Sequence, residues 1–186
     1  MSRQSFLFKR EPHWRESRVG LRQSLSPAMQ SWTYETGSLT QRLRNRYGNK
    51  VAVKVLVHHW RVPFLSERRL LKQAPKQLCL VREVLLYAGN SPLILARTIM
   101  PAKTVKMAHG SLLKLGNRPI GEVIFSYPQL KSQLTDLTII PMNLWTSNAN
   151  ELVGINQSLY GRRTLHNLAG QELIVSEFFL PDVLKI

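Results

Sequence analysis

The chain has 186 residues, enough for one domain with a sizeable core, and its 44% hydrophobic and 20% charged residues exclude a disordered chain. The formal net charge of +15 favours an anionic partner, whether a nucleic acid, a membrane surface or a small acid. The lone Cys79 excludes an internal disulfide and a multi-cysteine metal site, and it indicates a reducing, cytoplasmic location. No apolar run approaches the ~18 residues of a membrane span, and the N-terminus lacks the apolar core of a secretory signal.

The first thirty residues differ in composition from the rest of the chain. They are polar and basic, and Pro12, Gly20 and Pro27 interrupt any long periodicity. We therefore expect residues 1–30 to be a basic, weakly structured extension. Residues 31–186 are expected to form the folded domain.

Helical and strand patterns follow one another from there. Ser38 is suited to cap a helix that ends at Gly48. Residues 50–60, KVAVKVLVHHW, are rich in β-branched side chains and predict a strand. Residues 79–101 contain two apolar runs on either side of Gly89-Asn90, which predicts a β-hairpin.

The second half of the chain shows similar patterns. Residues 103–116 are expected to be helical, and Pro119 is suited to the first turn of another helix. Residues 134–145 predict a strand, and Pro141 marks it as an edge or bulged strand. Residues 159–181 have the pattern of a second apolar hairpin.

The two halves can be aligned as an internal repeat. When the second hairpin is laid on the first, Arg82 falls on Arg162. At nearly the same offset Leu39 falls on Ile120, and each lies just inside the predicted start of a helix. The pattern predicts an α+β fold in which a helix-plus-three-strand unit occurs twice and forms one six-stranded antiparallel sheet.

Ionisable residues occur where the strand period favours buried apolar ones. Glu177 lies within such a run in the second hairpin, and Arg82 and Arg97 do so in the first. One interpretation pairs Arg97 with Glu83, and Glu177 with Arg163 or Arg82. The other places two guanidiniums and one carboxylate around a cavity for a small acid, because arginine binds a carboxylate through two parallel hydrogen bonds. The three charges taken together favour the cavity.

Other chemistry has little support in the sequence. His58 and His59 are adjacent on a strand, so they face opposite ways and cannot chelate one metal ion. His13, His109 and His166 lack any partner spacing, and we expect surface or structural roles for them and no metal site. The basic residues are scattered without an aromatic platform, so nucleic-acid binding is not expected to be the main task.

Four stretches of the sequence resemble the chorismate lyase family, including its cyanobacterial and plastid-type members. They are GSLTQRL (37–43), VREVLL (81–86) with ARTIMP (96–101), LGNRPIG (115–121), and LYGRRTLHNLAGQELIVSEFFLP (159–181). The resemblance implies helical flaps over a buried pocket on a six-stranded sheet. It implies a carbon–oxygen lyase that removes pyruvate from chorismate and leaves 4-hydroxybenzoate, a precursor of ubiquinone and plastoquinone. A monomer in the cytoplasm, or in the plastid stroma if plastid-encoded, is expected.

The resemblance also assigns roles to five residues. Arg82 would hold the ring carboxylate, while Leu39 and Ile120 would contact the ligand from the two helix starts. Glu177 would meet the ring oxygen at the far end. Arg97 would bind the enolpyruvyl carboxylate, so that Glu177 and Arg97 are the expected catalytic residues. The sequence leaves open whether Glu177 is protonated and acts as an acid, or ionised and acts as a base.

The expected reaction makes the ring aromatic, so it needs no redox cofactor and no metal. Flaps closed over a flat product predict slow product release and product inhibition. The alternative function is a non-catalytic effector domain of the same fold that senses small acids, as in some bacterial transcription regulators. Residues 1–30 are too short for the winged helix that usually precedes such a domain.

Overall fold

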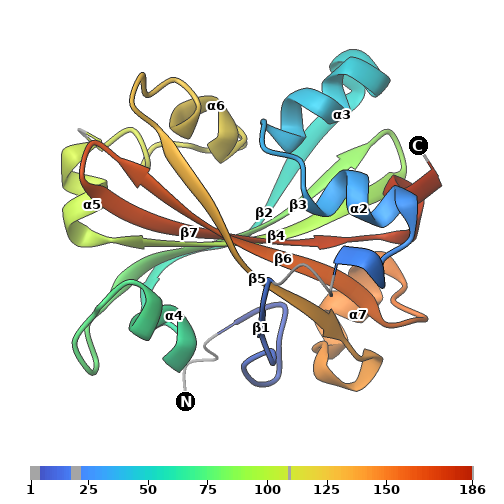
Figure 1. Ribbon diagram of the computed structural model, residues 1–186, viewed down its shortest axis with the longest axis horizontal. Helices are drawn as coiled ribbons and strands as arrows, with labels where there is room; N and C mark the ends of the chain where they lie inside the picture. Colours follow the sequence, from blue (N-terminus) through green and yellow to red (C-terminus); the bar gives the residue numbers. More distant parts are fainter. Residues whose placement is uncertain (1–4, 18–21, 109, 186) are drawn as a thin grey trace.

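The computed structural model describes residues 5–17, 22–108 and 110–185. A seven-stranded antiparallel sheet in the order β1-β5-β6-β7-β4-β3-β2 runs through the molecule (Figure 1). The strands are β1 (Arg15–Glu16), β2 (Val51–Arg61), β3 (Cys79–Ala88), β4 (Ser91–Pro101), β5 (Lys131–Ile140), β6 (Leu159–Leu168) and β7 (Gln171–Phe179). The helices are α2 (Pro27–Thr33), α3 (Leu39–Tyr47), α4 (Leu65–Leu70), α5 (Ala102–Met107), α6 (Ile120–Ile124) and α7 (Ser147–Val153). Within the described residues, no helix is long and apolar enough to cross a membrane.

The elements with strong local signals are confirmed. Both hairpins form, β3 with β4 and β6 with β7, and α3 is capped by the Ser38 hydroxyl, which accepts a hydrogen bond from the Gln41 N–H at 3.3 Å. The helix expected over residues 103–116 is shorter, because α5 ends at Met107; His109 lies outside the described residues. Pro119 precedes the first turn of α6 as its cap residue.

The expectation of six strands is wrong by one, because the N-terminal segment adds β1 to the edge of the sheet. Arg15 pairs with Leu137 and Glu16 with Asp136 of β5. The six long strands form two antiparallel blocks, β2–β3–β4 and β5–β6–β7, which join where β4 pairs with β7. The internal duplication itself stays a prediction.

The N-terminal segment also differs from the weakly structured extension expected over residues 1–30. Leu7 and Phe8 are buried, and the Phe8 ring lies 4.8 Å from that of Trp145 between centroids. The backbone N–H of Phe6 donates to a Glu83 carboxylate oxygen at 2.6 Å, and the Ser5 hydroxyl donates to the other oxygen at 2.5 Å. A buried carboxylate on the sheet therefore orders this segment, a long-range contact that local composition does not encode.

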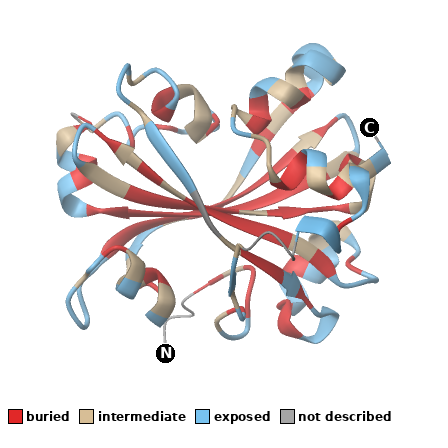
Figure 2. Cartoon of the chain, in the orientation of Figure 1, coloured by how far each residue is buried: buried red, intermediate tan, exposed pale blue. Residues whose placement is uncertain are grey.

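Both faces of the central strands are covered. Figure 1 shows α2, α3 and α6 on one side of the sheet and α4 and α7 on the other, and Figure 2 shows the middle of the sheet buried. On the first side, one apolar cluster gathers under α2 and α3 around Trp32 and Leu43, and a second gathers under α5 and α6 around Val105 and Ile124. The separation of these two clusters leaves room for a cavity between them.

Arg97 lies on the opposite face, where it joins a buried charge cluster. Its guanidinium donates to Glu67 of α4 at 2.7 Å and to Glu83 at 2.6 Å, and all three side chains are at most 4% exposed. Although burial alone opposes the charge, the two carboxylates raise the pKa of Arg97. The pairing of Arg97 with Glu83 is thus confirmed, and Glu67 is an additional partner that lies thirty residues away in sequence.

We predict that Arg97→Leu destabilises the fold by about 3–5 kcal/mol, because it leaves two carboxylates buried without their cation. Urea unfolding monitored by circular dichroism measures this change. Lys185→Ala is the control, since its ion pair with Asp182 is exposed and is worth about 0.5 kcal/mol or less. Equal losses in the two variants would contradict the structural role of Arg97.

Candidate functional site

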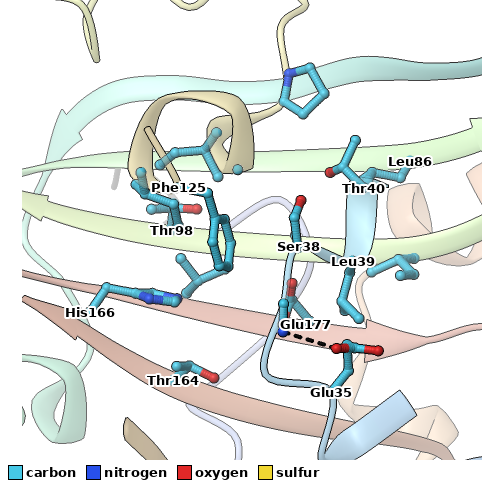
Figure 3. Close-up of a pocket in the computed structure, with 18 of the residues that line it drawn as sticks. Glu35, Ser38, Leu39, Thr40, Leu86, Thr98, Phe125, Thr164, His166 and Glu177 are labelled. Carbon is cyan, nitrogen blue, oxygen red and sulfur yellow. Dashed lines mark hydrogen bonds between the residues drawn. The ribbon is translucent and has the colours of Figure 1, made fainter. Parts of the chain in front are cut away.

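A cavity of about 180 Å³ lies between the sheet and the starts of α3 and α6. It is smaller than the roughly 300–1,000 Å³ typical of drug-sized ligands, so its size suits one small molecule. Its sheet floor comes mainly from β3, β4, β7 and β6, with Val53 of β2 and Ser132 of β5 at its edges, and its walls are mostly apolar. Figure 3 shows the lining side chains between the α3 start and the sheet.

The two helix starts close the cavity from above. Leu39 is the first residue of α3 and Ile120 the first of α6, and both line the cavity, as the family resemblance implied. The starts touch each other: a Cβ added at Gly121 would lie 3.0 Å from the Ser38 hydroxyl oxygen. Glycine at this position therefore permits the close approach of the two flaps.

An ion pair also joins the flaps at their outer side. Arg44 of α3 donates to Glu122 of α6 at 2.6 Å, and Arg118 donates to the other carboxylate oxygen at 3.2 Å. Desolvation would raise the pKa of Glu122, but hydrogen bonds from both arginines lower it overall. The pair is part-exposed, so it holds the flaps only weakly.

Arg82 brings an uncompensated positive charge into the cavity. Its side chain is 2% exposed, and it donates to the carbonyl oxygens of Gly116 and Arg118 at 2.9 and 3.1 Å and approaches His58 Nδ1 at 3.4 Å. Among the described residues it has no carboxylate partner. Burial lowers the pKa of Arg82 to about 10, which still leaves it charged at neutral pH. This end of the cavity can therefore bind an anion.

Glu177 faces the cavity from β7, but its partner is neither of the two arginines expected from sequence. Arg162 lies directly opposite it in the β6–β7 register and donates through Nε at 2.7 Å. The Nη1 atom of Arg162 is bound to three main-chain carbonyls, of Trp32, Thr33 and Glu35. Arg163 points to the other face and pairs with Asp136 at 2.5 Å. One hydrogen bond to Arg162 leaves the Glu177 carboxylate with further acceptor capacity toward the cavity.

Of the five site residues expected from sequence, the cavity brings together Arg82, Leu39, Ile120 and Glu177. Arg97 is not among the lining residues. Its neighbours Ala96 and Thr98 line the cavity, and because side chains alternate along a strand, Arg97 points the other way. The expectation that Arg97 binds the enolpyruvyl carboxylate is therefore wrong.

Sequence reasoning missed His166, which the structure places in the cavity lining. It is 6% exposed, its Nδ1 lies 2.8 Å from the Ser132 hydroxyl on β5, and its ring meets that of Phe125 edge-on. Strand periodicity could have indicated this position, since Arg162, Thr164 and His166 occupy alternate positions of one strand and so share a face. Among the described residues, no cluster of His, Cys, Asp and Glu has an arrangement that would hold a metal ion.

We predict that His166 makes the fold acid-sensitive. Burial, and then the charge of Arg162, lower the pKa of His166 from 6.5 to about 4. As the pH falls from 6.5 to 4, the unfolded chain takes up a proton that the folded chain does not, so folding loses up to about 3 kcal/mol. Urea unfolding between pH 4 and 7 should show a shallower decline for His166→Leu than for the parent. Parallel declines would contradict this.

Comparisons with known proteins agree with this arrangement. A family model described as chorismate lyase matches residues 12–185. A probable chorismate pyruvate-lyase of Methylococcus capsulatus is 38% identical over 158 residues, 85% of this chain and 98% of that protein. Another, from Pseudoalteromonas translucida, is 37% identical over 84% of this chain and 86% of its own length.

Solved structures show the same fold at low sequence identity. The effector domain of PhnF from Mycobacterium smegmatis has a TM-score of 0.59 at 13% identity, covering 80% of this chain and 91% of that one. A GntR-family transcriptional regulator from Bacillus cereus has a TM-score of 0.56 at 15% identity, covering 72% and 94%. The family model matches residues 12–185, and the relatives cover most of both chains, so the chain belongs to the chorismate lyase family.

Proposed function

We propose that this protein is a chorismate pyruvate-lyase, a carbon–oxygen lyase that converts chorismate to 4-hydroxybenzoate and pyruvate. The observation that carries the proposal is the buried Arg82 guanidinium, which has no carboxylate partner and lies in a cavity whose other end holds the Glu177 carboxylate. A ring acid with an oxygen substituent opposite its carboxylate matches these two ends. The names of the relatives support the same reaction.

The reaction breaks the bond between the ring and the ether oxygen. The electron pair leaves with the enolpyruvate oxygen, the ring carbon that bears the hydroxyl loses its proton, and the ring becomes aromatic. Enolpyruvate then takes up a proton to give pyruvate. No redox change occurs, so the tasks that fall to the protein are positioning and charge stabilisation.

The residues of the cavity divide these tasks. Arg82 binds the ring carboxylate and fixes one end of the substrate. Glu177 is paired with Arg162 and so acts as a carboxylate: it accepts a hydrogen bond from the ring hydroxyl, and we assign it as the base for the ring proton. Leu39 and Ile120 cover the ring, and the contacts between the flaps exclude water and slow product release, so product inhibition is expected.

The second candidate is a small-acid-sensing domain without catalysis, because the solved structures of similar fold are those of transcriptional regulators. The higher identity to lyase relatives favours the enzyme. A cytoplasmic location fits the single, buried Cys79, and a monomer fits a cavity lined entirely by one chain. Supply of ubiquinone or plastoquinone synthesis is the expected use of 4-hydroxybenzoate.

The assay is incubation of purified protein with chorismate while pyruvate and 4-hydroxybenzoate are quantified. We predict equimolar release of both products by the parent. Arg82→Ala should lower kcat/KM about 100-fold or more, because it removes the guanidinium that binds the ring carboxylate. Glu177→Gln should lower kcat about 100-fold or more, because it removes a proton acceptor.

The control for both variants is His59→Leu, which changes an exposed side chain on β2 and should turn over like the parent. Circular dichroism confirms that each variant is folded before the rates are compared. Absence of product from the parent would refute the enzyme. Unchanged kinetics in both Arg82→Ala and Glu177→Gln would refute the site.

A further inference from the structure

The proposed substrate carries two carboxylates, and Arg82 is a partner for only one of them. Arg82 takes the ring carboxylate, while Arg97 is bound to Glu67 and Glu83 on the other face of the sheet. A carboxylate brought into a largely apolar cavity needs a hydrogen-bond donor there. The inference that follows rests on the proposed function and concerns the enolpyruvyl side chain of the substrate.

The strand register divides the cavity floor into two flanks. One row across the sheet runs from Arg82 through Thr98 and Val175 to Thr164, and Glu177 lies two residues to one side of it on β7. A line from Arg82 to Glu177 therefore crosses the floor diagonally. A ligand anchored at both ends would lie along this line, with its side chain directed to one flank or the other.

The two flanks differ in chemistry. On one side lie the hydrocarbon side chains of Val84, Leu86 and Ile94. The other side carries hydroxyl and imidazole groups, contributed by the lining residues Thr98, Thr164, Ser132 and His166. Within the sheet floor, the second flank supplies the neutral hydrogen-bonding groups for a carboxylate, so we expect the enolpyruvyl side chain to point toward β6 and β5.

His166 is the strongest donor on this flank. Its Nδ1 lies 2.8 Å from the Ser132 hydroxyl, and its Nε2 has no hydrogen-bond partner among the described residues. When the Ser132 hydroxyl donates to Nδ1, the ring proton resides on Nε2, which is then a free donor in the cavity lining. Figure 3 shows the His166 ring extending from β6 toward Phe125, under the flap formed by α6.

We propose that His166, held in the Nε2–H form by Ser132, binds the side-chain carboxylate of the substrate and so distinguishes substrate from product. The product has lost this side chain and keeps only its contacts with Arg82 and Glu177. His166 is thus a specificity residue of the same site. It favours entry of the dicarboxylate without strengthening retention of the monocarboxylate.

The test compares two ligands that differ only in a carboxymethoxy side chain. Isothermal titration gives the Kd of 4-hydroxybenzoate and of 3-(carboxymethoxy)-4-hydroxybenzoate. The second compound, called the armed ligand below, is a stable aromatic acid with a second carboxylate beside the hydroxyl. His166→Leu should weaken the armed ligand about 10- to 100-fold, the effect of losing a hydrogen bond to a charged group, and change the Kd of 4-hydroxybenzoate less than about twofold. His166→Gln, which retains an N–H donor, should recover part of the loss.

Two further variants complete the design. Ser132→Ala removes the group that orients the ring, and because Ser132 is exposed the fold should tolerate it; a loss of a few-fold for the armed ligand alone is expected. His59→Leu is the matched control and should bind both ligands like the parent. Equal weakening of both ligands by His166→Leu would show a role in cavity shape only, and no weakening of either would show no role; each result overturns the proposal.

This test is independent of turnover. If the parent binds both ligands but releases no pyruvate from chorismate, the proposed function fails and the binding comparison still decides the role of His166. If the parent turns over chorismate and His166→Leu retains the kcat/KM of the parent, the proposed function stands and the role of His166 is refuted.

Discussion

The Arg82 guanidinium is buried among carbonyl oxygens and one imidazole, and among the described residues no carboxylate neutralises it. A buried charge without a counter-ion is costly, so its retention in the fold calls for an anion from outside. The rest of the site follows from this constraint. The cavity is small and mostly apolar, the Glu177 carboxylate lies at its far end, and two helix starts cover it.

Some buried arginines of this fold are paired with carboxylates of the same chain, and Arg82 is left for a ligand. Arg97, on one face of the sheet, is bound by two carboxylates and helps to hold α4 and the N-terminal segment in place through Glu67 and Glu83. On the other face, Arg162 binds Glu177 and three carbonyls, two from the last residues of α2 and one from Glu35 just after it, which fixes the carboxylate and the approach to α3 together. Only Arg82 lacks an anionic partner within these clusters.

Sequence reasoning reached the elements and residues that have local signals. Helix caps and strand periodicity placed Leu39 and Ile120 at helix starts, and they placed Arg82 and Glu177 in buried strands. Periodicity could not assign Arg97 to a face, because the central strands are apolar on both faces and a shift of one residue reverses every side chain. The second carboxylate partner of Arg97, Glu67, and the burial of the N-terminal segment depend on contacts between distant residues, which a single sequence does not specify.

The most direct test of the central claim is whether the charge of Arg82 selects an acid. The measurement is the Kd of 4-hydroxybenzoate and of its neutral amide, 4-hydroxybenzamide, for the parent and for Arg82→Gln. The account predicts that the parent prefers the acid by about tenfold or more and that Arg82→Gln loses this preference while still binding the ring. Equal affinity of the parent for the acid and the amide would contradict it.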